Sequence, residues 1–90
     1  MPLRLVSLPE RGKPDTPRLW FNPEHVTSMA PVLERFGDAD GEHIALSVEL
    51  KLQGLPVTRN WLATCADGDA ADIAWDGFLR LVEGREAPQP

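Results

Sequence analysis

A stretch of alternating side chains limits the fold more than any other feature of the sequence. Between His43 and Gln53, aliphatic residues occupy every second position, and mostly polar residues lie between them. The aliphatic residues are Ile44, Leu46, Val48, Leu50 and Leu52. Successive side chains of a strand point to opposite faces, whereas a helix would scatter these five around its axis. The stretch therefore predicts a long antiparallel strand with one buried face.

The length and the composition indicate one small folded domain. The chain has 90 residues, of which 42% are hydrophobic and 26% are charged. Such fractions are ordinary for a globular protein, and a chain of this size suits one core. We expect a single domain over residues 1–86 and a flexible tail at residues 87–90.

The chain has features of a protein that works inside the cell, away from membranes. Cys65 is the only cysteine, so no internal disulfide can form. No apolar run approaches the ~20 residues that span a bilayer, and the N-terminus has no signal-peptide pattern. We therefore expect a cytoplasmic protein without a membrane partner.

The first part of the chain is predicted to form two short strands around a proline-rich loop. Residues 3–8 are apolar and suit a strand, and residues 18–21 suit a second one. Between them, residues 9–17 contain three prolines and a glycine. Proline has no N–H donor and a fixed φ, so this segment is expected to be a loop or an edge excursion.

The next segment predicts a strand that leads into a hairpin. The pair Asn22-Pro23 favours a turn that ends the second strand. A third strand is expected over residues 26–33, where Pro31 is acceptable only at a sheet edge or a bulge. The Asp- and Gly-rich residues 36–42 are predicted to form the turn into the long strand.

After the long strand, a second turn and a further strand are expected. Gly54 and Pro56 indicate the turn, and residues 57–63 suit its partner strand. Either face of this strand can be the buried one. We take Val57 and Trp61 as the inward residues, because Trp61 has the larger area to bury.

The last segment predicts an amphipathic helix over residues 70–83, with Asp69 as its cap and Gly84 as its stop. Its apolar stripe is wide enough to cover a sheet. The stripe comprises Ala71, Ala74, Trp75, Phe78, Leu79, Leu81 and Val82. The predicted fold is therefore α+β, with a four- or five-stranded antiparallel meander sheet or small open barrel closed by one C-terminal helix.

A short segment resembles a known family of small β proteins. Asn22, Pro23, Glu24 and Val26 form an Asn-Pro-acid-x-aliphatic segment at the end of a strand. In this respect the chain is similar to the small flagellar FlbD-like β-meander proteins. The resemblance implies a non-catalytic protein that acts through protein partners, and it transfers no functional residue.

No residue pattern predicts catalysis, a metal site or a cofactor. Residues 38–42 contain two Asp and a Gly, but aligning the glycine with that of a calcium loop puts an aromatic residue at the first ligand position. His25, His43 and Cys65 lack the short paired spacing of zinc ligands. Cys65 has no accompanying nucleophile motif. We therefore expect a protein that is not an enzyme, with no metal and no cofactor.

An aromatic patch is the first candidate for partner binding. Tryptophan is enriched at interface hot spots, and Trp20 lies in a short strand before a turn. The predicted surface consists of Trp20, Phe21, Val26 and Met29, although Trp20 also suits a core position. An exposed strand edge also favours pairing with a second copy of the chain.

Two charged regions provide the alternatives. Asp69, Asp72, Asp76 and Glu83 fall on one side of the predicted helix and are able to mimic a phosphate backbone. Residues 1–21 contain four basic and two acidic residues, a balance of +2, whereas the remaining twelve acids and five bases give −7. Nucleic acid is therefore not the expected partner, since only this basic arm supplies cations.

These features predict a small protein–protein interaction module or regulatory adaptor. An aromatic patch or a strand edge would dock on a protein partner or form a homodimer. The first alternative is an acidic inhibitor of a phage or mobile element that blocks a nucleic-acid-binding protein. The second is a weak DNA-binding regulator that uses the basic N-terminal arm.

Overall fold

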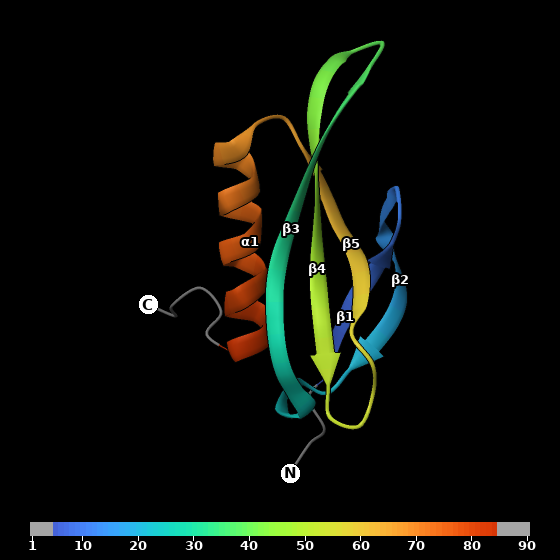
Figure 1. Ribbon diagram of the computed structural model, residues 1–90, viewed down its shortest axis with the longest axis vertical. Coiled ribbons are helices and arrows are strands. Elements are labelled where there is room, and N and C mark those ends of the chain that lie inside the picture. The colour runs from blue at the N-terminus through green and yellow to red at the C-terminus, as the bar shows by residue number, and fades with distance from the viewer. Residues whose placement is uncertain (1–4, 85–90) are drawn as a thin grey trace.

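The chain folds into two antiparallel sheets and one helix (Figure 1). The structure is a computed structural model, and it describes residues 5–84. In chain order the elements are β1 (Val6–Glu10), β2 (Lys13–Phe21), the 3-10 turn η1 (Pro23–His25), β3 (Val26–Asp38), β4 (Gly41–Leu52), β5 (Thr58–Cys65) and α1 (Gly68–Glu83). The α+β class is confirmed. The strands, however, are divided into a β1-β2 sheet and a β3-β4-β5 sheet, which do not close into a barrel.

The long alternating strand is the centre of the larger sheet. β4 pairs with β3 on one side and with β5 on the other. Leu46 and Val48 are 0% exposed and Leu50 is 1% exposed, as the alternation predicts. Burying such a side chain contributes about 1.5–3 kcal/mol, so this face is the main source of hydrophobic stabilisation.

The apolar face of β4 is covered by two elements rather than by the helix alone. Near the start of the strand, the helix forms the cover, and a buried cluster there contains Ile44, Leu46, Cys65 and Ala71. Near its end, the β1-β2 hairpin joins the helix, and the second cluster contains Val6, Leu8, Phe21, Val48, Leu50 and Val82. The hairpin is therefore part of the core and not an appendage.

The proline-rich segment at residues 9–17, predicted as a loop or an edge excursion, forms paired edge strands of a hairpin rather than an unpaired loop. Pro9 pairs with Pro17 across the two strands, and Gly12 makes the turn with φ of 78°. Both strands of a two-stranded sheet are edge strands, where proline is tolerated. The register is irregular on both sides of Pro9, which is where the prolines interrupt regular pairing.

The β3-β4 hairpin is longer than predicted. Pairing with β4 extends β3 to Asp38, and only residues 39 and 40 remain in the turn. Gly41 follows with φ of 119°, a conformation that glycine adopts readily. Pro31 lies in β3, which is an edge strand, in agreement with the sequence expectation.

The fifth strand is shifted by a bulge, and this changes which of its residues are buried. The register slips between Leu46 and Ser47, so that Trp61 pairs with Ser47 on the face opposite to the helix. Trp61 is 9% exposed, but Val57 is 58% exposed and precedes the strand. The prediction of an inward residue is therefore confirmed for Trp61, which is buried, and wrong for Val57, which is exposed.

The helix begins two residues earlier than predicted and ends as expected. Asp67, and not Asp69, is the N-cap, and its carboxylate accepts a hydrogen bond of 2.8 Å from the backbone N–H of Ala70. Gly84 ends the helix in a left-handed conformation with φ of 77°. Within residues 5–84, no helix is both long enough and apolar enough to cross a membrane. The predicted tail at residues 87–90 lies outside the described residues.

Candidate functional site

The predicted aromatic patch is divided between the core and the surface. Trp20 is 57% exposed, whereas Phe21, the next residue of β2, is 4% exposed and lies in the core cluster. Val26 and Met29 are half-buried and pack against the same cluster. Phe21, Val26 and Met29 therefore pack together in or against the core, whereas the side chain of Trp20 faces the solvent.

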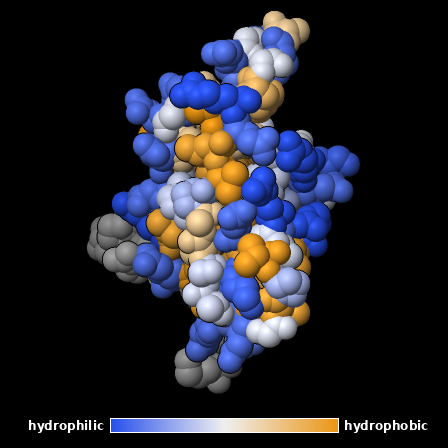
Figure 2. Space-filling view, viewed as in Figure 1, coloured by the Kyte–Doolittle hydropathy of each residue, from blue (hydrophilic) through white to orange (hydrophobic). Residues whose placement is uncertain are grey.

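Trp20 lies on the outer face of the hairpin. It pairs with Ser7 of β1, while the neighbouring pair, Val6 and Phe21, points inward. Leu5, immediately before β1, is also exposed. The face of the molecule in Figure 2 shows its hydrophobic residues as separate patches among hydrophilic ones. An indole held at the surface by a buried neighbour is therefore a defined contact point.

The four acidic residues predicted on the helix are all exposed. Asp69, Asp72, Asp76 and Glu83 keep the spacing that places them on one side of α1. Asp76 forms an ion pair with Arg80 at 3.1 Å. The row is thus solvated, and one of its charges is partly neutralised by the same helix.

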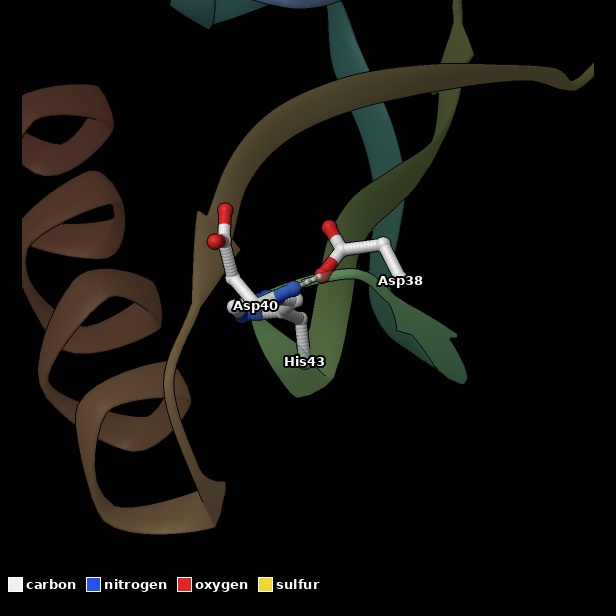
Figure 3. Close-up of polar contacts among 3 residues, drawn as sticks. All are labelled: Asp38, Asp40 and His43. Atoms are coloured by element: carbon white, nitrogen blue, oxygen red, sulfur yellow. Dashed lines mark hydrogen bonds and ion pairs between the residues drawn. The ribbon is translucent and has the colours of Figure 1, made fainter.

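In the β3-β4 turn, the side chain of His43 contacts the carboxylate of Asp38 (Figure 3). Asp38 Oδ1 lies 3.0 Å from His43 Nε2 and also accepts a hydrogen bond of 2.8 Å from the backbone N–H of Asp40. The His43 ring also lies 5.5 Å from the ring of Phe36. These contacts hold the turn together, which explains why Asp occurs at this position.

Cys65 is a buried residue on the apolar face of the sheet. It pairs with Ile44 on the apolar face of β4, so His43 projects from the opposite face. Burial, together with the negative charge of Asp67, raises the pKa of the Cys65 thiol. A raised pKa keeps the thiol protonated at neutral pH. Among residues 5–84, no three His, Cys, Asp or Glu side chains come close enough to hold a metal ion.

A groove lined by arginines lies between the β1-β2 hairpin and β5. We call it the arginine groove, and it has a volume of about 330 Å³. The side chains that define it are Glu10, Arg11, Arg18, Arg59, Asn60 and Trp61. They come from the hairpin and from β5, which lie side by side in the fold. Three arginines thus border one hollow of an otherwise acidic chain.

Arg18 is held in this groove by a buried amide. Its Nη2 donates to Oδ1 of Asn60, a residue only 3% exposed. The amide nitrogen of Asn60 donates in turn to Thr58 Oγ1 at 3.1 Å. Arg18 is therefore fixed in position, and the other N–H groups of its guanidinium remain able to donate.

The charges around the groove are unequally matched. Arg59 pairs with Glu49 at 3.0 Å and with Glu34 at 3.8 Å across the outer face of the sheet. Glu10 pairs with Lys13 at 3.4 Å. Within residues 5–84, neither Arg11 nor Arg18 has a carboxylate partner. The groove therefore has two arginines, Arg11 and Arg18, that no carboxylate within residues 5–84 pairs with.

Only some of the residues that line this groove could be recognised from the sequence. Arg11 and Arg18 belong to the basic arm that the charge distribution identifies. Arg59 and Asn60 are 41 or more positions further along, and only the packing of the hairpin beside β5 brings them close. No spacing rule links residues across that distance.

Comparisons with protein-family models, with curated proteins and with solved structures find no match for this chain. The resemblance to FlbD-like proteins at residues 22–26 therefore stays a prediction.

Proposed function

We propose that this chain is a small protein–protein interaction module without catalytic activity, and that it docks through the outer face of the β1-β2 hairpin around Trp20. The observation that supports the proposal is the contrast within β2. Trp20 is 57% exposed, although it adjoins Phe21, which is 4% exposed. A large apolar side chain on the surface of a small protein is a typical interface anchor.

The position of Trp20 favours binding because its strand is already ordered. Phe21 and Leu19 connect β2 to the core cluster on either side of Trp20. An interface residue on a fixed strand loses less conformational entropy on binding than one on a mobile loop. The partner is a protein of complementary shape, and a second copy of this chain is one such partner.

A pair of alanine substitutions tests the proposal. Trp20→Ala removes the anchor, whereas Val57→Ala removes a side chain of similar exposure, 58%, from the β4-β5 connection. Wild-type protein is used to capture its partner from the source cells, and the partner is then purified for calorimetric titration. We expect Trp20→Ala to weaken binding by about 30-fold or more, which corresponds to the 2 kcal/mol of a hot spot.

A control variant and the salt dependence of binding distinguish the proposal from the alternative functions. Val57→Ala should leave the dissociation constant within about threefold of wild type, since most interface-distant positions are neutral. Sedimentation velocity of the purified chain tells whether the partner is a second copy. Equal affinity for wild type and Trp20→Ala contradicts the proposal. Affinity that falls steeply with salt and depends on Asp72 favours the acidic-mimic alternative instead.

A further inference from the structure

We infer that the arginine groove is a binding site for a carboxylate that carries an adjacent apolar group, as a peptide segment of a partner protein presents it. The site is separate from the Trp20 surface, because Trp20 is not among the residues that line it. The two proposals therefore stand or fall independently.

The groove provides donors that are fixed before any ligand arrives. Arg18 is connected through Asn60 to Thr58, and Asn60 is only 3% exposed. Guanidinium groups match carboxylates with two parallel hydrogen bonds, and such charge-assisted bonds are the strong ones. A guanidinium held by a neutral amide keeps its full charge for a ligand.

The positive charge of Arg11 and Arg18 suits a ligand with a single oxyanion. Arg11 and Arg18 have no carboxylate partner within residues 5–84, whereas Arg59 is shared between Glu34 and Glu49. Glu10 also borders the groove, although Lys13 lies 3.4 Å from it. A single carboxylate gains the attraction of two guanidiniums without approaching the glutamates on the outer sheet face.

A second hollow can accommodate the apolar group of the ligand. It has a volume of about 260 Å³, and Gly12, Pro14, Trp61, Ala63 and Thr64 line it. Trp61 also lines the arginine groove, so the two hollows share a lining residue. A carboxylate in one hollow and an aliphatic side chain in the other is the combination that a peptide supplies.

The charge of the rest of the chain disfavours a polyanion. Apart from the basic arm, the sequence has twelve acidic and five basic residues. A nucleic acid presents a phosphate at every nucleotide and would extend from the groove over this acidic surface. A peptide places one charge in the groove and continues with uncharged atoms.

Titration with small probes tests the inference. N-acetylleucine combines a carboxylate with an isobutyl group, N-acetylleucinamide lacks the charge, and acetate lacks the apolar group. The three tryptophan indole N–H signals are followed by nitrogen-proton correlation spectra, because Trp20, Trp61 and Trp75 report on three different places. We expect N-acetylleucine to shift the Trp61 signal with saturation, acetate to require a higher concentration, and N-acetylleucinamide to produce no saturable shift.

Substitutions of single arginines identify the donors. Arg11→Gln and Arg18→Gln should each raise the half-saturating concentration of N-acetylleucine by about tenfold, the value of one charge-assisted hydrogen bond. Arg80→Gln removes a helix arginine far along the chain and should change nothing. The Arg11 side chain has no hydrogen-bond partner within the described residues, so Arg11→Gln tests the site even if Arg18→Gln unfolds the protein. Trp20→Ala should leave the titration unchanged.

Four results would overturn the inference. The first is an equal shift with N-acetylleucinamide, and the second is a titration that Arg11→Gln leaves unchanged. The third is tighter binding of inorganic phosphate than of N-acetylleucine, which would assign the groove to a phosphoryl group. The fourth is binding of duplex DNA through Trp61 at about 0.15 M salt, which would support a nucleic-acid site.

Discussion

The two hairpins of this fold differ in how regularly their strands pair. β3 and β4 pair at twelve positions with one irregularity, whereas β1 and β2 pair at five positions with two irregularities. Both nevertheless supply side chains that are completely buried, Leu46 in the long hairpin and Leu8 in the short one. Regular pairing is therefore not required for a hairpin to form part of the core.

The irregularity of the short hairpin changes where its side chains point. Leu8 pairs with Leu19 and Pro9 with Pro17, so Arg18 is an extra residue without a partner in β1. Such a bulge redirects a side chain, and Arg18 reaches Asn60 of β5. The candidate binding features are thus concentrated in the less regular hairpin, while the regular hairpin supplies the central strand.

The largest expected effect tests whether the short hairpin belongs to the core. Phe21→Ala should lower the free energy of unfolding by about 3–5 kcal/mol, because it leaves a cavity beside Val48 and Leu50. Trp20→Ala, one residue away, should lower it by no more than about 1 kcal/mol. Urea denaturation followed by circular dichroism measures both. Similar losses for the two variants would show that the hairpin is not anchored as described.

A buried and an exposed alanine substitution can also be compared in the long hairpin. Leu46 and Leu33 are direct partners in the register, but Leu46 is 0% exposed and Leu33 is 51% exposed. Leu46→Ala should cost about 2–5 kcal/mol and Leu33→Ala about 0.5 kcal/mol or less. The two losses in the free energy of unfolding are compared through the urea midpoints, with the slope of the free energy against urea concentration held constant. A cost for Leu33→Ala near that of Leu46→Ala would mean that an unseen partner covers β3.

The turns of the two hairpins should differ by a smaller amount. Neither Gly41 nor Gly12 has an atom within 4 Å of an added Cβ, so only backbone strain distinguishes them. The φ of 119° at Gly41 is less accessible to alanine than the φ of 78° at Gly12. Thermal unfolding should show a loss of about 1–3 kcal/mol for Gly41→Ala, and a smaller loss for Gly12→Ala. The reverse order would contradict these turn conformations.

The smallest effect concerns pH and the three-stranded sheet. The pKa of Cys65 is raised in the folded chain above its ordinary value of 9.0, so the unfolded chain loses the thiol proton first. Stability should therefore be unaffected by this group at neutral pH and should fall as the pH rises through that value. Urea unfolding at both ends of this range measures the change. In Cys65→Ala the part of the pH dependence that is due to the thiol should be absent.

The parts of the fold that follow from local patterns were predictable. The alternation around Leu46 and Val48 identified the central strand, and Gly84 identified the end of the helix. The position of Pro31 in an edge strand also followed from the chemistry of proline. In each case, the residues themselves contain the geometric constraint.

The parts that depend on packing were not predictable. Prolines around Gly12 indicated a loop, yet the strands pair there, next to Leu8 and Leu19, which pack in the core. The bulge beside Ser47 moved Trp61 to the other face, and no alternation within β5 reveals a slip in its partner. The arginine groove needs both events, because the hairpin must lie against a strand whose register has already shifted.

The outer margin of β3 has a consequence for the behaviour of the protein in concentrated solution. This strand has 13 residues, and a margin of that length would ordinarily attract a foreign strand. Pro31 has no N–H to offer, and the exposed charges of Glu34 and Arg35 must be desolvated before another backbone can approach. The length of β3 would favour fibril growth along this margin, but its proline and its charged residues oppose that growth.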